Sequence, residues 1–167
     1  ASWSRGLGDV YKRQANSLCK NLNKDDEIIL SEIEHHANII PWQMAAKKYG
    51  LNIKYIKIDD SYNLDLDHLN SLLTSKTKIV SIVGESNMSG MLPNIKDIVS
   101  NVKSKSDAIF ILDGAQLVPH RFVDVQDLGI DFLCVSGHKM LGPTGIGVVW
   151  GRNCLLYTSD AADESVS

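Results

Sequence analysis

The sequence predicts an α/β fold, a mostly parallel sheet with helices on both faces. Short apolar runs that fit strands buried on both faces alternate along the chain with segments whose apolar residues recur at helical spacing. This alternation is typical of parallel strands joined by helices. No repeat or linker interrupts it between residues 15 and 152. In such sheets ligands bind beyond the carboxyl ends of the strands, so the residues that follow each strand are the first candidates for a site.

The first part of the pattern predicts two strands with a helix between them. One strand is expected at Glu27–Leu30, and the other at Asn52–Ile58, where apolar and polar residues alternate. The helix is expected over Asn38–Tyr49, with Pro41 in its first turn and Gly50 as its C-terminal stop. The apolar residues expected to share one face of this helix are Ile39, Ile40, Met44, Ala45 and Tyr49.

The second part predicts two further helices and four further strands. The helices are expected over Asp65–Leu73, with four leucines at helical spacing, and over Ile95–Val102, with apolar residues at positions 95, 98, 99 and 102. The strands are expected at Lys78–Val83, Ala108–Leu112, Asp131–Val135 and Ile146–Trp150.

Composition excludes several classes of protein. The chain has 167 residues, 44% of them hydrophobic, and a formal net charge of −3, which fits one globular domain and argues against a nucleic-acid-binding protein. No apolar run approaches the ~20 residues that span a bilayer, and no signal peptide is visible. Cys19, Cys134 and Cys154 form no CxxC pair, so we expect neither a disulfide framework nor a metal site. We expect the protein to be cytoplasmic.

The two ends do not continue the pattern of the middle. Residues 1–14 read ASWSRGLGDVYKRQ, and residues 153–167 end in CLLYTSDAADESVS. Both resemble translated sequencing-adaptor segments. We therefore expect both segments to be non-native, and residues 15–152 to be an internal piece of a longer protein.

The segment that carries most chemistry is Ser136-Gly137-His138-Lys139, directly after an expected strand. A lysine at such a place is usually a solvated surface charge. Here, however, Ser136 and His138 can donate hydrogen bonds to a phosphate, and Gly137 lets the backbone approach a ligand closely. An amine held beside an anionic group and an electrophilic carbonyl is the setting for a Schiff base.

Asp113 closes the apolar run at 108–112, where a carboxylate is costly to bury without a partner. One interpretation is a helix N-cap or turn residue. The other is a partner for a cationic group of a ligand, such as a protonated pyridinium nitrogen, whose pKa a neighbouring carboxylate raises. Gln116, three residues later, can bond a ring hydroxyl through its amide.

His35 and Asn87 are further candidates, because each lies just beyond an expected strand. His35 is either structural or a ring that stacks on a flat cofactor and moves protons. Adjacent His35 and His36 point in different directions and make a poor metal pair, so no metal is expected. The glycine and histidine patterns of dinucleotide-binding, P-loop, serine-hydrolase and zinc-protease sites are absent from the sequence.

Separated segments of the chain together resemble the class V aminotransferase family of pyridoxal-phosphate enzymes, above all its cysteine desulfurase and selenocysteine lyase branch. In the family's order they read SEIEHHANIIPWQ, SNMSG, ILDGAQLVPH, VDVQDLGIDF and SGHKMLGPTGIGVVWG. The spacing from Asp113 to Lys139 also suits the family. The resemblance implies that residues 15–152 are part of the large, cofactor-binding domain of a fold-type I pyridoxal-phosphate enzyme.

The resemblance also implies a role for each candidate residue. Lys139 would hold pyridoxal 5′-phosphate covalently and move protons. Asp113 would pair with the pyridine nitrogen, and Gln116 would contact the phenolic oxygen. His35 would stack on the ring and assist proton transfer. Ser136 and His138 would bind the phosphate, and Asn87 would contact the cofactor or the substrate.

The activity implied for the parent protein converts L-cysteine, or selenocysteine, to L-alanine and leaves the sulfur on an enzyme thiol for iron–sulfur cluster assembly. The implied partners are a second copy of the parent and a sulfur-acceptor protein. Two features of the family lack a match in the sequence: the Gly-Thr-rich phosphate loop, and the C-terminal domain with its nucleophilic cysteine and its substrate-binding arginine. Cys134, inside an expected strand, is interpreted as a core residue.

We therefore expect this chain to be an inactive part of a desulfurase, and to aggregate or stay partly unfolded when isolated. Two alternatives remain open. The parent is another class V enzyme, such as a selenocysteine lyase, an epimerase, an aminotransferase or a kynureninase-like hydrolase. Otherwise the chain is a non-catalytic α/β binding module in which Lys139 is only a surface charge.

Overall fold

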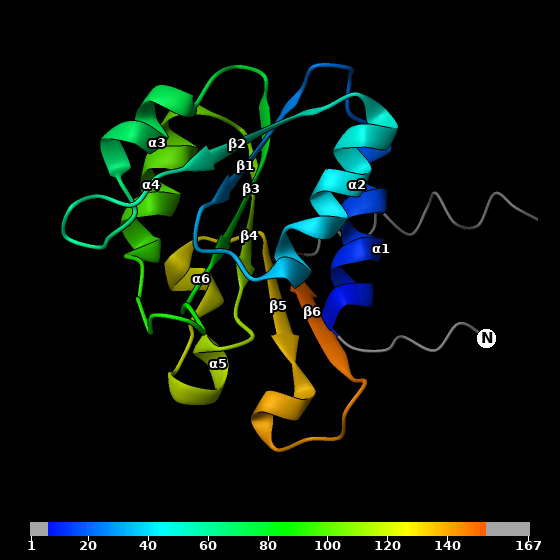
Figure 1. Ribbon diagram of the computed structural model, residues 1–167, viewed down its shortest axis with the longest axis vertical. Coiled ribbons are helices and arrows are strands. Elements are labelled where there is room, and N and C mark those ends of the chain that lie inside the picture. Colours follow the sequence, from blue (N-terminus) through cyan, green and yellow to red (C-terminus); the bar gives the residue numbers. More distant parts are fainter. Residues whose placement is uncertain (1–6, 153–167) are drawn as a thin grey trace, which may run out of the picture.

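The computed structural model describes residues 7–152, which form one six-stranded sheet between two layers of helices (Figure 1). The strand order is β2-β1-β3-β4-β5-β6; the first five strands are parallel and β6 runs antiparallel to β5. The predicted mostly parallel sheet and its six strands are confirmed. The strands are β1 (Glu27–Ser31), β2 (Asn52–Ile56), β3 (Thr77–Val83), β4 (Ile109–Asp113), β5 (Phe132–Ser136) and β6 (Gly147–Gly151).

Helices α1 and α2 cover one face of the sheet, and α3, α4 and α6 cover the other (Figure 1). The short elements α5, α6 and η2 were not predicted, because four residues are too few to show a helical period. The helices are α1 (Leu7–Cys19), α2 (Ile40–Tyr49), α3 (Leu66–Leu72), α4 (Ile95–Lys105), α5 (Leu117–His120) and α6 (Val125–Leu128), with 3-10 turns η1 (His36–Asn38) and η2 (Gly137–Met140).

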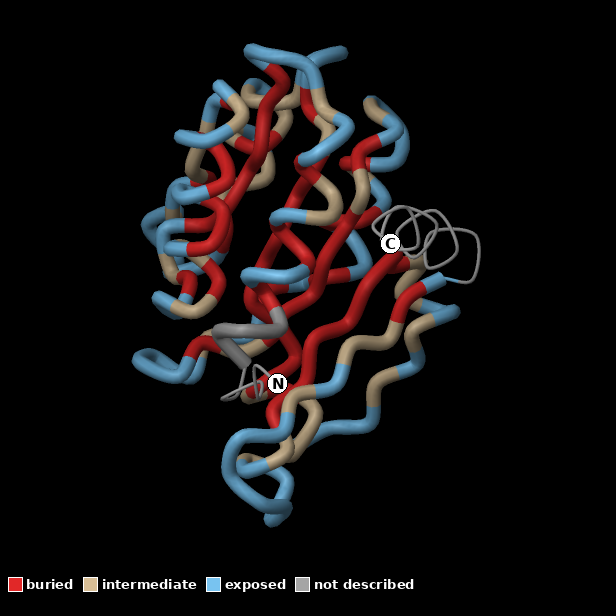
Figure 2. Tube along the Cα trace, turned by 90° about the vertical axis from the view of Figure 1, so that its right-hand side faces the viewer, coloured by how far each residue is buried: buried red, intermediate tan, exposed pale blue. Residues whose placement is uncertain are grey.

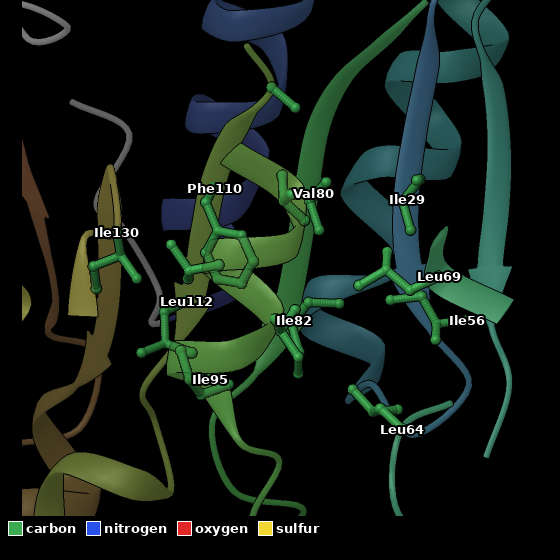
Figure 3. Close-up of a cluster of buried hydrophobic side chains, with 14 of the residues drawn as sticks. Ile29, Ile56, Leu64, Leu69, Val80, Ile82, Ile95, Phe110, Leu112 and Ile130 are labelled. Carbon is green, nitrogen blue, oxygen red and sulfur yellow. The ribbon is translucent and has the colours of Figure 1, made fainter. Parts of the chain in front are cut away.

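The sheet separates two hydrophobic cores, because successive side chains of a strand point to opposite faces. On β4, Phe110 and Leu112 belong to the core under α3 and α4, whereas Ile111 belongs to the core under α1 and α2. Figure 3 shows the first core, in which Phe110 of β4 lies between Val80 of β3 and Ile130. Figure 2 shows the buried residues running along the central strands, while most of the connecting loops are exposed. Strands buried on both faces explain the continuous apolar runs of the sequence.

Helix α2 buries a different face from the one predicted. Gly50 ends the helix in the left-handed conformation as expected, with φ of 71°. However, Ile40 and Met44 are 48% and 55% exposed, and the buried residues of the helix are Pro41, Trp42, Ala45 and Ala46. The indole of Trp42 occupies the core beneath α1, and the two alanines let the helices pack closely; this arrangement decides which face turns inward.

Helix α1 runs through the boundary expected at residue 15. Tyr11, Ala15 and Cys19 lie four residues apart on its buried face, and the adjoining Gln14 accepts a hydrogen bond from the Cys134 thiol at 3.1 Å. Tyr11 and Gln14, which precede that boundary, are thus packed against the expected domain in this structure. Residues 1–6 and the whole segment 153–167, including Cys154, lie outside the described residues. No helix within residues 7–152 is long and apolar enough to cross a membrane.

Candidate functional site

The polar residues that follow β1, β3, β4 and β5 meet at the carboxyl edge of the sheet. The ends of these strands are in register: Val83 of β3 pairs with Asp113 of β4, which pairs with Cys134 of β5. The loops beyond them surround a hollow of about 240 Å³, called here the carboxyl-edge hollow. Its lining residues are His35, Ala37, Val83, Glu85, Asn87, Asp113, Ala115, Gln116, Ser136, His138 and Lys139.

All seven residues singled out in the sequence line this hollow. They come from four separate loops, which the parallel strands bring together at one edge. The hollow holds the volume of about eight water molecules, enough for one small substituted ring. Two other hollows are larger, but their linings lack the candidate residues. Within residues 7–152 no three His, Cys, Asp or Glu side chains are grouped to hold a metal ion.

Asp113 ends β4 and is only 2% exposed. Its Oδ1 accepts the N–H of Ala115 at 2.9 Å, so the turn interpretation is confirmed, and the same side chain also borders the hollow. Burial raises the pKa of the Asp113 carboxyl, while the Ala115 N–H and the nearby Lys139 ammonium favour its charged form. Gly114 lets the turn pass close to β5, since a Cβ there would lie 2.6 Å from Leu133 Cδ1. The hollow therefore contains one buried acid that a cation can pair with.

The turn η2 carries the second group of candidates. Ser136 is fully buried at the end of β5, and its Oγ lies 2.8 Å from Nδ1 of His138. The half-buried Lys139 follows on the same turn. The Gly137 N–H donates to the Ile146 carbonyl at 2.9 Å, which ties the turn to β6. A hydroxyl, an imidazole and an amine are thus held within four residues of one another at the hollow.

His35 lines the hollow from the loop after β1, a strand separated from β5 by β3 and β4. Its Nδ1 accepts the N–H of Ala37 at 3.1 Å, so in the neutral ring the proton is on Nε2. Gln116 stands at the N-cap of α5, but its side chain makes no capping bond. Asn87 is exposed at the rim of the hollow. The amides of Gln116 and Asn87 are thus placed to contact a ligand.

Sequence reasoning assigned no role to two acidic residues near the site. Glu85 follows β3 and lines the hollow, and its Oε1 is 3.2 Å from Nδ1 of His120. The signal that identified Asp113, a polar residue after an apolar strand, applies equally to Glu85. Glu34, buried beside His35, accepts hydrogen bonds from Ser31 Oγ, from the Val83 N–H at 2.8 Å and from Asn38 Nδ2 at 2.7 Å. No local sequence pattern indicates that set of donors.

Neither described cysteine is placed to react. Cys19 and Cys134 are free thiols, both buried. Burial raises the pKa of the Cys19 thiol to about 12 and that of Cys134 still further. Since the thiolate is the reactive form, both are interior packing residues, as predicted for Cys134.

The chain is similar to known proteins over most of its length. The family model described as aminotransferase class-V matches residues 3–161. A probable cysteine desulfurase of Halalkalibacterium halodurans is 43% identical over 136 residues, 81% of this chain and 33% of that protein. A cysteine desulfurase of Haloferax volcanii is 42% identical over 135 residues, 81% of this chain and 32% of that protein. The chain thus spans about a third of the length of these curated relatives.

Solved structures of cysteine desulfurases are also similar to this chain. The cysteine desulfurase CsdA of Escherichia coli, in its S-sulfonic acid form, superposes with a TM-score of 0.88 and 36% identity over 93% of this chain and 39% of its own. The apo cysteine desulfurase of Thermococcus onnurineus NA1 superposes with a TM-score of 0.85 and 34% identity, over 93% of this chain and 38% of its own.

Proposed function

Since the chain belongs to the class-V aminotransferase family, we propose that its carboxyl-edge hollow binds pyridoxal 5′-phosphate and that its parent protein is a cysteine desulfurase. One observation carries the proposal: Lys139 and the buried Asp113 border the same hollow, with Ser136 and His138 beside the lysine. The names of the relatives support the same activity. A further solved structure, SspA in complex with cysteine, superposes with a TM-score of 0.81 and 26% identity over 90% of this chain and 43% of its own.

The residues present fit this cofactor. A buried carboxylate suits a cationic ring nitrogen, because charge pairing offsets the cost of burying both groups. Ser136 Oγ and His138 Nδ1 are hydrogen-bonded to each other, which leaves the pair one free O–H or N–H donor for a phosphate when the imidazole is neutral and two when it is protonated. When bound, pyridoxal phosphate supplies an electron sink for the carbanion chemistry of an amino acid.

The protein's contribution is binding, orientation and proton transfer. Lys139 would hold the cofactor carbonyl through Nζ, and once the substrate amine has displaced it, the freed amine would be placed to accept and return protons at the substrate carbon. Asp113 would favour the protonated ring nitrogen. The Nε2–H of His35 would be a proton donor at the hollow, and the Gln116 amide would bond the phenolic oxygen. Asn87, at the rim, would contact the cofactor or the substrate.

We assign L-cysteine, or selenocysteine, as the substrate of the parent protein, with alanine as the product and a thiolate elsewhere in the parent as the sulfur-accepting nucleophile. Cys19 and Cys134 are too deeply buried for that role. Their free thiols favour a reducing, cytoplasmic location. We also propose that the parent protein forms a homodimer and passes the sulfur to an acceptor protein. Exposed apolar residues beside the site support a contact there: Met140, Leu141, Ile146 and Val148.

Covalent capture of the cofactor tests the proposed function. Pyridoxal phosphate is added to the wild-type parent protein, to its Lys139→Ala variant and to its Lys47→Ala variant, which changes an exposed lysine on α2. Borohydride reduction followed by peptide mass spectrometry then locates the modified lysine. We expect modification of Lys139 in the wild type and in Lys47→Ala, and its loss in Lys139→Ala. Equal modification of many lysines, or none, would instead support a non-catalytic binding module.

A further inference from the structure

Glu34 lies at the centre of a buried hydrogen-bond network beneath the loop that carries His35. Its Oε1 accepts from the Ser31 hydroxyl and from the Val83 N–H at 2.8 Å. Its Oε2 accepts from Asn38 Nδ2 at 2.7 Å. Ser31 and Asn38 are both fully buried, so water cannot replace these bonds. The network therefore ties β1, β3 and the turn η1 to one carboxyl group.

The orientation of the Asn38 amide is fixed by its other partners. The Trp42 Nε1–H, which can only donate, reaches Asn38 Oδ1 at 2.9 Å, and Ser81 Oγ lies 2.7 Å from the same oxygen. Asn38 Nδ2 must therefore face Glu34 as a donor. The Val83 N–H is likewise only a donor, so both oxygens of Glu34 are required as acceptors.

A carboxyl group meets this requirement in either protonation state, whereas an amide does not. When Glu34 carries a proton, its hydroxyl can donate to Ser31 Oγ while still leaving acceptor capacity for the Val83 N–H and Asn38 Nδ2. A glutamine would set its NH₂ against either Asn38 Nδ2 or the Val83 N–H. The substitution Glu34→Gln therefore disrupts the network although it conserves size.

His35 lies between the two anchored residues, Glu34 and Asn38. The Asn38 N–H donates to the His35 carbonyl at 2.8 Å, and the Ala37 N–H donates to His35 Nδ1 at 3.1 Å. Holding Asn38 therefore holds the backbone of His35, and the adjoining Ala37 N–H holds its ring. We propose that Glu34 is a positioning residue that, through Asn38 and the Ala37 amide, orients the imidazole of His35 at the carboxyl-edge hollow. Its effect on the cofactor rests on the proposed function.

Amide hydrogen exchange in the cofactor-free parent protein tests the positioning role. In Glu34→Gln, we expect the amides of Ala37 and Asn38 to exchange roughly tenfold faster relative to the amides of β4, none of which bonds Glu34. The matched control is Glu32→Gln, an exposed acid on the same loop, in which the ratio should not change. Equal acceleration of all amides would show a merely structural role and overturn the proposal. If Glu34→Gln does not fold, Ser81→Ala, which removes one partner of Asn38, should shift the ratio in the same direction.

A double-mutant cycle in the parent protein then tests the effect on the cofactor. Glu34→Gln should raise the dissociation constant of pyridoxal phosphate roughly tenfold in the wild type, but by less than about twofold in His35→Ala, because its effect passes through that ring. Equal effects in both backgrounds would overturn the proposal. A wild-type parent protein that binds the cofactor no better than Lys139→Ala would refute the proposed function instead, and the exchange measurement would still decide the role of Glu34.

Discussion

The buried carboxyl of Glu34 makes the stability of this protein depend on pH in a direction opposite to that of a salt-bridged acid. Burial raises its pKa from 4.5 to about 8, with the nearby Asp113 charge adding to the rise and the three hydrogen bonds opposing it. Between these two pKa values the folded protein holds a proton that the unfolded chain has released. The free energy of unfolding therefore falls as the pH rises through this window.

The magnitude follows from the two pKa values. Each pH unit between them changes the free energy of unfolding by up to about 1.4 kcal/mol, so Glu34 alone accounts for a loss on the order of 5 kcal/mol between pH 4.5 and 8. The contribution is fully present below pH 4.5 and is lost as the pH passes 8. The raised pKa of Asp113 acts in the same direction. A loss of this size is a large part of the stability of an ordinary domain.

Urea unfolding of the wild-type parent protein and of its Glu34→Gln variant at pH 5, 6, 7 and 8 measures this contribution. The variant lacks the titrating group but keeps Asp113, so the difference between the two curves isolates Glu34. We expect the wild type to lose several kcal/mol more than the variant across the series, with Glu32→Gln following the wild type. Parallel curves for the wild type and Glu34→Gln would show that Glu34 does not titrate with a raised pKa.

Three further predictions concern local structure, each measured by chemical unfolding. Trp42→Phe removes the Nε1–H donor to Asn38, and we expect a loss of about 1–2 kcal/mol; a smaller loss when Asn38 is already alanine would confirm that path, and an equal loss would contradict it. Gly50→Ala places a Cβ at φ of 71°, 3.1 Å from Lys24 Cγ, and should cost about 1 kcal/mol, whereas unchanged stability would contradict the strained cap. Asp65→Ala removes the acceptor of the His68 N–H at the start of α3 and should lower the free energy of unfolding by about 1 kcal/mol, whereas Asp65→Asn should keep most of that stability. Equal losses of stability in the two variants would exclude a capping role for Asp65.

Most of the fold was predictable because its signals are local. Ile95, Ile98, Val99 and Val102 recur at helical spacing, and all four are buried on α4 as predicted. The face of α2 was mispredicted because apolar residues occur on both of its sides, and a period cannot tell which side meets the sheet. The indole of Trp42 occupies the core, and Ile40 and Met44 turn outward.

All seven candidate residues that line the hollow were predictable from the amino-acid sequence, although Glu85 was missed. The carboxyl ends of parallel strands share one edge, so a polar residue after each apolar run, such as Asp113 or Ser136, is carried there by topology alone. The hydrogen-bond partners that support these residues depend on how the chain packs. Glu34 meets Val83, 49 residues away, and Asn38 meets Ser81, 43 residues away, across neighbouring strands. The partners of a buried hydrogen-bonding group are set by packing in three dimensions, which no spacing along the chain encodes.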